Sequence, residues 1–328
     1  MTCRLPASYL TLNVAVATVC ITSPDTDGAD TLNKGNPMKD AGFSGHVHRV
    51  ALLSAALVTA TVTLSATGQT AELSSPWHEA HMSQVRLIAA RRGDNGQDIV
   101  AGIQVALQPG WKTYWRNPGD AGGVPPEFDW SGSGNVANTE VLYPAPKRFR
   151  DPAGETIGYK GNVVMPVLVR PADPDQDVEL RVKFNFGICA DICVPVEQEL
   201  TVNVPRQAQA GLPSLLQKAL DLIPRSEASA KVGDPKLVQH EVHLSGDQPR
   251  ILLDVDFGSA AHEGDVFAEA SDDFYLPMPA RMQEGSTTAS RFEIDLREAD
   301  DVSKLKGKTI RLTLVGAEGQ SEATFVVK

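Results

Sequence analysis

Apolar side chains alternate with polar ones along several short stretches of this chain, a period of two that predicts half-buried β-strands. The clearest case runs from Val178 to Phe186, where every second residue is apolar and its neighbours are polar or charged. Gly187 ends the alternation, and two cysteines follow at Cys189 and Cys193. The sequence therefore places a cysteine pair at the end of a β-strand.

The same kind of pattern recurs on both sides of this strand. Further strands are predicted at 85–89, 99–107, 127–130, 136–143, 163–169 and 197–204, and again at 237–244, 251–257, 265–270, 291–296, 310–315 and 324–327. Glycine- and proline-rich turns separate them, and only residues 213–224 have the leucine spacing of a short helix. Short strands without intervening helices are typical of antiparallel β-sandwiches. We expect two sandwich domains joined by a helical linker.

The chain length of 328 residues agrees with two domains of ordinary size. We place the first at residues 72–206, the linker with its helix at 207–235, and the second at 236–328. A formal net charge of -11 argues against nucleic-acid binding, which requires a basic surface to neutralise phosphates. Proteins or small molecules are the expected partners.

The region before the first domain has the pattern of a secretory signal peptide. Basic residues follow Met38, an apolar run extends from Val50 to about Leu64, and small residues allow cleavage after Gly68 or Ala71. We assign residues 38–71 to this signal, because an apolar run of this length is short for a membrane anchor, which is the alternative.

Signal peptides begin at the N-terminus, so residues 1–37 are interpreted as an upstream extension from a misplaced start codon. Cys3 and Cys20 would then be absent from the mature protein, leaving Cys189 and Cys193 as its cysteines. We expect a mature protein in an oxidising compartment, the bacterial periplasm.

Three residues separate Cys189 from Cys193. A disulfide brings two Cα atoms to within roughly 4.4–6.8 Å, which an extended strand would exceed, so the segment between them must bulge or turn. So small a loop removes little entropy from the unfolded chain, which favours a redox pair over a structural staple. The chemistry of the pair alone leaves a redox centre, a structural disulfide and a metal site open.

Three separated motifs carry a family resemblance. The first, FGICADICVP at 186–195, resembles the active-site segment of the N-terminal periplasmic domain of the thiol:disulfide interchange protein DsbD. The other two resemble the ScsB-like variant of that family: GWKTYWRNPGDAG at 110–122, and YPAP at 143–146 with GYK at 158–160. The resemblance covers about residues 75–205. It implies an immunoglobulin-like fold and a cysteine pair that passes electrons to or from other periplasmic thiol proteins.

The resemblance also implies roles for individual residues. Cys193 matches the cysteine that attacks partner disulfides, and Cys189 matches its resolving partner. Trp111 and Tyr114 match an aromatic strand beside the pair. The segment from about Phe149 to Tyr159 corresponds to a loop that shields the cysteines, with Phe149 and Asp151 expected at its tip.

The chain departs from the family in two respects. Its cysteine spacing is shorter than in the best-known DsbD domain, and it has neither the membrane transporter nor the thioredoxin-like domain of full DsbD. We therefore expect a thiol shuttle without a cofactor, whose partners are thioredoxin-like or disulfide-isomerase proteins and a separate membrane electron transporter.

Two other functions remain open from the sequence. The cysteine-free C-terminal part suggests a non-catalytic binding or scaffold module with an inert disulfide. His78, His81 and Met82 could bind copper, since copper accepts both histidine and methionine ligands, although the same residues would fit an irregular tail.

Overall fold

The computed structural model describes residues 73–328 except 93–97, 152–153, 259–262, 272–273, 283–288 and 300. The described residues all fall within one compact unit, Ala66–Lys328. The expected extension at 1–37 and signal peptide at 38–71 lie outside the described residues. None of the described helices is long and apolar enough to cross a membrane.

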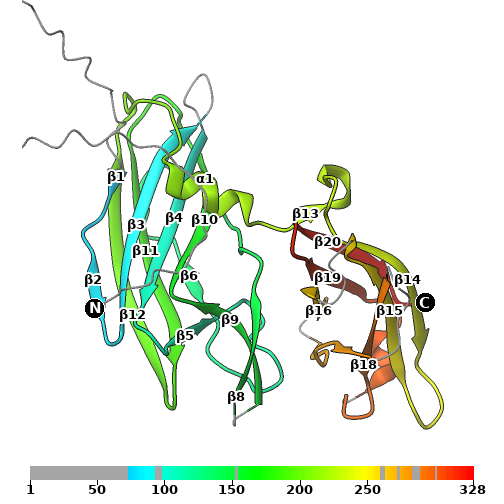
Figure 1. Ribbon diagram of the computed structural model, residues 1–328. Helices are drawn as coiled ribbons and strands as arrows, with labels where there is room; N and C mark the ends of the chain where they lie inside the picture. The colour runs from blue at the N-terminus through cyan, green and yellow to red at the C-terminus, as the bar shows by residue number, and fades with distance from the viewer. Residues whose placement is uncertain are drawn as a thin grey trace, which may run out of the picture. The chain divides into compact units, whose positions relative to one another are not determined.

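Two antiparallel sheets build the first sandwich (Figure 1). One sheet contains β1 (Leu73–Ser74), β2 (His78–Ala80), β3 (Ser83–Arg92), β4 (Asp98–Leu107), β7 (Val136–Val141) and β10 (Asn162–Pro171). The other contains β5 (Lys112–Tyr114), β6 (Glu127–Asp129), β8 (Lys147–Asp151), β9 (Gly154–Lys160), β11 (Val178–Cys189) and β12 (Cys193–Val204). The order in this second sheet is β12-β11-β5-β9-β8, with β6 also paired to β11.

The alternation along β11 explains how the two sheets pack. Leu180, Val182, Phe184 and Phe186 are all buried in one hydrophobic core together with residues of β3, β4 and β10. The rings of Phe184 and Phe186 stack with centroids 4.4 Å apart. Burial of one face of each strand against the opposite sheet is the main stabilising term for such a sandwich.

The second sandwich also has two sheets, β13-β20-β19-β16 and β14-β15-β18-β17. Its strands are β13 (Arg225–Ser226), β14 (Lys236–His243), β15 (Arg250–Asp256), β16 (Asp265–Ala270), β17 (Ala280–Arg281), β18 (Ala289–Asp295), β19 (Thr309–Val315) and β20 (Gln320–Val326), with short 3-10 turns at Glu227–Ser229 and Val302–Leu305. Every pairing is antiparallel except β13 with β20. The expected all-β fold of two sandwiches is confirmed.

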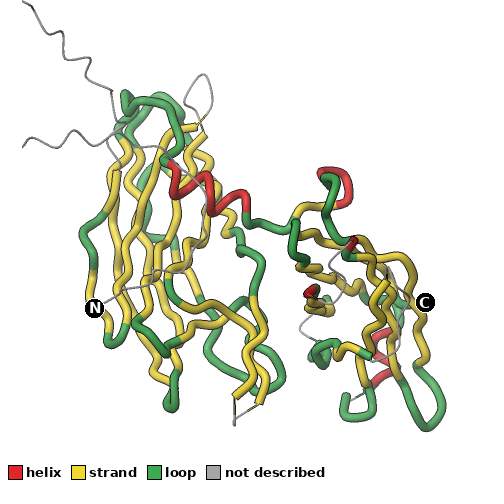
Figure 2. Tube along the Cα trace, in the orientation of Figure 1, coloured by secondary structure: helices red, strands yellow, loops and turns green. Residues whose placement is uncertain are grey.

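The predicted helix at 213–224 forms α1 (Ser214–Asp221), drawn in red between β12 and β13 along the chain in Figure 2. It packs on β4 and β10 through Leu216 and Ala219, which are buried with Val164. A side chain at Gly102 in β4 would meet Leu216 and Val164, so this mid-strand glycine makes room for the helix. The helix is thus part of the surface of the first sandwich.

Three strands of the cysteine-bearing sheet were not predicted as strands from alternation. β5, β8 and β9 are short or interrupted by glycine and charge, so they lack the apolar period of a half-buried strand. They are strands because they pair with their neighbours in the sheet: β5 pairs with β11 and β9, and β9 pairs with β5 and β8. Cross-strand hydrogen bonding here overrides a weak local pattern.

An ion pair in the second sandwich gives a testable pH dependence. Arg225 hydrogen-bonds Asp234, whose side chain is 1% exposed, and the backbone N–H of Lys231 donates to the same carboxylate at 2.7 Å. The guanidinium hydrogen bond lowers the pKa of Asp234, so its contribution to stability is present above the ordinary carboxyl pKa and is lost as pH falls through the lowered value.

We expect Asp234→Asn to destabilise the protein by about 2 kcal/mol, between the small value of a surface pair and that of a fully buried one. Thermal unfolding at pH 7 and pH 3 measures the effect. The difference between the variant and the wild type should shrink at the lower pH, and a constant difference would contradict this role for the carboxylate.

Candidate thiol–disulfide site

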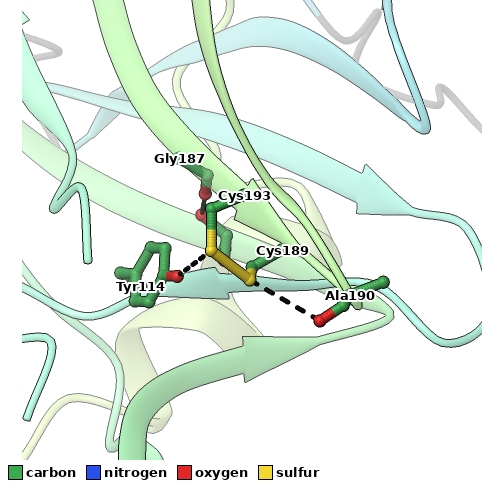
Figure 3. Close-up of a disulfide and its surroundings, with 6 residues drawn as sticks. Tyr114, Gly187, Cys189, Ala190 and Cys193 are labelled. Carbon is green, nitrogen blue, oxygen red and sulfur yellow. Dashed lines mark hydrogen bonds between the residues drawn. A yellow bond between two sulfur atoms is a disulfide. The ribbon is translucent and has the colours of Figure 1, made fainter. Parts of the chain in front are cut away.

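Cys189 and Cys193 close the end of the β11–β12 hairpin. They are directly opposed in the register, their Cα atoms lie 4.2 Å apart, and a disulfide joins their sulfur atoms (Figure 3). The three residues between them form the turn, in which the Ala190 N–H donates to the Ile192 carbonyl at 3.1 Å. The expected reversal of the chain between the cysteines is present, and it brings the pair together without a bulge in the paired strands.

The two cysteines differ in their exposure to solvent. Cys189 is 7% exposed, whereas Cys193 is among the exposed residues. The turn beside them presents Ile192 with 66% of its surface exposed. Cys193 is therefore accessible beside the exposed Asp191 and Ile192 of the turn, while Cys189 is covered.

Tyr114 lies directly beside the exposed cysteine. Its hydroxyl oxygen is 3.1 Å from Cys193 Sγ, and the ring is buried (Figure 3). With the disulfide formed, the hydroxyl is the group that can donate. After reduction, the same O–H would donate to the Cys193 thiolate, and a hydrogen bond to the charged form lowers a thiol pKa.

Close backbone packing positions this tyrosine. Thr113 Oγ1 donates to the Gly187 carbonyl at 2.7 Å, and Gly187 N–H donates to the Val124 carbonyl at 3.0 Å. A side chain at Gly123 would collide with the Tyr114 ring, and one at Gly187 would meet Val124 and the same ring. The glycines allow the 119–124 loop and β11 to enclose the tyrosine.

We expect Gly123→Ala to displace the Tyr114 ring and to destabilise the protein by about 1–3 kcal/mol, through overpacking and through the strain of an alanine at the Gly123 φ of 153°. Thermal unfolding and the rate of Cys193 alkylation in the reduced protein measure the two consequences. Gly122→Ala is the matched control, because Gly122 has a positive φ of 73° but open space where a side chain would begin. Equal behaviour of the two variants would exclude contact with the ring as the cause.

The structure places the other predicted residues at different distances from this centre. Trp111 precedes β5 and packs partly on the core. Tyr159 is buried, its hydroxyl donates to the Pro144 carbonyl at 2.8 Å, and burial raises its pKa well above the ordinary value. Phe149 is in β8, opposite Thr156, and Asp151 ends that strand. Their shielding of the cysteines stays a prediction.

The histidine motif lies in a hairpin at the other sheet. His78 is in β2 opposite Val85, His81 has a φ of 53° in the turn, and Met82 is 43% exposed. The segment therefore has regular structure instead of an irregular tail. Among the described residues, no three histidine, cysteine, aspartate or glutamate side chains cluster as a metal site would require.

Two lysines near the cysteines were missed by the sequence analysis. Lys112 in β5 is directly opposite Cys189, and Lys160 in β9 is directly opposite Lys112. Directly opposed residues project from the same face of a sheet, so both lysines share the face of the cysteines. The only signal in the sequence was their position inside the GWKTYW and GYK motifs.

The cysteine pair at the hairpin end and the tyrosine hydroxyl beside it lie in a domain related to thiol–disulfide interchange proteins. Residues 84–205 match the family model described as thiol:disulfide interchange protein DsbD, N-terminal. This part of the chain is a DsbD-like N-terminal domain, as its motifs predicted.

Among solved structures, the chain is similar to the N-terminal periplasmic domain of ScsB from Proteus mirabilis, with a TM-score of 0.61 and 19% sequence identity. The match covers 78% of this chain and 98% of that one, so the shared fold extends over both sandwiches. No curated protein matches the sequence significantly.

Proposed function

We propose that this chain is a periplasmic thiol–disulfide exchange protein in which Cys189 and Cys193 cycle between dithiol and disulfide. The observation that carries the proposal is Cys193, an exposed residue whose sulfur is hydrogen-bonded by Tyr114 and joined to a buried partner cysteine. The family match over residues 84–205 supports the same chemistry.

The reaction in the reducing direction has two exchange steps. The Cys193 thiolate attacks one sulfur of a partner disulfide, forms a mixed disulfide and releases the other partner sulfur as a thiolate. The Cys189 thiolate then attacks Cys193 Sγ, which re-forms the Cys189–Cys193 disulfide and releases the second partner thiolate. Two electrons pass to the partner, and the two thiol protons of the pair end on the partner's thiols.

A purely structural role explains the pair less well. Closing a loop of about four residues removes roughly 2 kcal/mol of unfolded-state entropy, against about 4.7 kcal/mol for a loop of 100 residues. The sandwich around it already buries a continuous core drawn from both sheets. The position of the disulfide, at the exposed tip of a hairpin whose strands are paired along their whole length, adds little to the fold.

Thioredoxin-like or disulfide-isomerase proteins are the proposed partners, because they present the exposed disulfides and thiols that this reaction needs. A separate membrane electron transporter is the proposed source of electrons. We infer a periplasmic location from the signal-peptide pattern and from the periplasmic domain to which the fold is similar.

Trapping of a mixed disulfide tests the proposal. A Cys189→Ser variant keeps Cys193 but cannot resolve the mixed disulfide, so it should retain its redox partners from a periplasmic extract, to be named by mass spectrometry. Cys193→Ser is the matched control, because it retains an equally free but buried thiol. Equal capture by both variants, or by neither, would contradict the proposed roles.

A further inference from the structure

An apolar cavity of about 630 Å³ lies between α1, the β9–β10 hairpin and the start of β8. Phe149, Leu215 and Leu222 contribute apolar surface to it. Leu222 is 53% exposed although it is a large aliphatic residue. The volume is within the range of about 300–1,000 Å³ that is usual for ligand-binding pockets.

The charges that line this cavity all have one sign. Lys147, Lys160 and Lys218 line it, and none of its lining residues is an aspartate or glutamate. This is unusual in a chain with a net charge of -11. Lys160 Nζ also lies 4.6 Å from the centroid of the Phe149 ring, which holds a cation against the apolar surface. The cavity is therefore complementary to an apolar group that is flanked by negative charge.

Strand register connects one lining residue of the cavity, Lys160, to the cysteine pair. Four neighbouring strands place their residues directly opposite one another in this order: Cys193, Cys189, Lys112 and Lys160. Neighbouring strands are about 4.8 Å apart, so the backbone at Lys160 is roughly 10 Å from the backbone at Cys189. Gly158 lies two residues before Lys160, so it is on the same face of the sheet, and Lys147 is directly opposite Gly158. Phe149 is two residues after Lys147 and therefore shares this face.

We propose that this cavity, with Lys147, Lys160 and Lys218 around it, forms a docking groove for an acidic, apolar segment of the protein with which the cysteine pair exchanges disulfides. The inference rests on the proposed function. Cys193 is one strand further from Lys160 than Cys189 is, a backbone separation of roughly 14 Å over three strand spacings. An extended chain advances about 3.3 Å per residue, so a segment whose cysteine is joined to Cys193 reaches the groove with a residue about four positions away. Its apolar side chain enters the cavity, and neighbouring carboxylates face Lys147, Lys160 and Lys218.

The test uses synthetic thiol peptides as the probe. Each carries a cysteine, a two-glycine spacer and then phenylalanine between two glutamates, in both chain directions. Matched peptides replace the glutamates by lysines or the phenylalanine by serine. The rate constant for reduction of the Cys189–Cys193 disulfide should be about tenfold higher for the acidic peptide than for the basic one at low salt. This preference should largely disappear in 1 M salt, and the serine peptide should be slower than the phenylalanine one.

Charge reversal tests whether the lysines of the groove cause the preference for acidic peptides. A Lys147→Glu/Lys160→Glu double variant should prefer the basic peptide, whereas Lys306→Glu, an exposed position in the second sandwich, should behave as wild type. Equal rates for acidic and basic peptides, or a preference that survives in the double variant, would overturn the proposal.

Three further measurements separate the docking groove from the redox function. Dithiothreitol needs no groove, so its rate should be the same in all the variants. If dithiothreitol reduces the disulfide normally but the protein shows no preference among the peptides, the docking groove is excluded and the redox function is not. A fluorescent cysteine-free acidic peptide should bind a Cys189→Ser/Cys193→Ser protein, and dodecanoate should not change the peptide reduction rates. Binding of dodecanoate in place of the peptide would assign the cavity to a small amphiphile and overturn the proposal.

Discussion

A Cys193→Ser variant is expected to react with an aromatic disulfide reagent about 100-fold more slowly than a Cys189→Ser variant. The thiol that remains in the first variant, Cys189, is 7% exposed, whereas Cys193 in the second is open to solvent. A buried thiol reacts only when the hairpin end opens, and a local opening free energy of about 2.7 kcal/mol corresponds to 100-fold. The rate of release of the reagent's coloured thiol measures the difference.

Denaturant provides the control for this comparison. Both variants should react at similar rates when unfolded, because only the folded protein distinguishes the two positions. Similar rates in the native proteins would mean that the hairpin end does not protect Cys189, and the assignment of attacking and resolving cysteines would lose its basis.

A Tyr114→Phe variant is expected to react more slowly at neutral pH through Cys193, because the thiolate loses the hydroxyl that lies 3.1 Å from its sulfur. A hydrogen bond to a charged group contributes about 1.5–3 kcal/mol. Removing the Tyr114 hydroxyl takes this stabilisation away from the thiolate, so the pKa of the Cys193 thiol rises. A thiolate of higher pKa is intrinsically more nucleophilic, with a Brønsted coefficient of about 0.4–0.5, and this offsets part of the loss. The net effect is a rate about three- to tenfold lower at pH 7.

The pH dependence distinguishes this effect from simple loss of packing. Alkylation rates of reduced Cys189→Ser and Cys189→Ser/Tyr114→Phe proteins should converge or cross at high pH, where both thiols are ionised. A uniform decrease at every pH would instead indicate that the ring merely positions the sulfur. Tyr159→Phe is the control, since that hydroxyl is bonded to the Pro144 carbonyl.

The sequence predicted the fold where alternation is strong. The strand before the cysteines was expected from Val178 to Phe186, and β11 extends beyond the end of this alternation to Cys189. The long strands β3, β4 and β10 were predicted in the same way, because one of their faces is buried against the opposite sheet. Such burial imposes a regular apolar period that can be read without the structure.

The candidate site was predictable only in part. The cysteines and Tyr114 were found because they stand in motifs with a family resemblance, but their contact depends on the pairing of β5 with β11. Nothing local in the sequence indicates that Lys112 and Lys160 are in register with Cys189. Long-range strand register of this kind is set by tertiary packing, which single-sequence patterns do not encode.

The reduction potential of the Cys189–Cys193 pair is the most direct test of the central claim. The protein is equilibrated in redox buffers of stepped potential, and the dithiol fraction is counted by alkylation and mass spectrometry. We expect a midpoint above about -300 mV, in the range of proteins that exchange disulfides. A pair that stays oxidised below that potential would behave as a structural disulfide and would contradict a role in thiol–disulfide exchange.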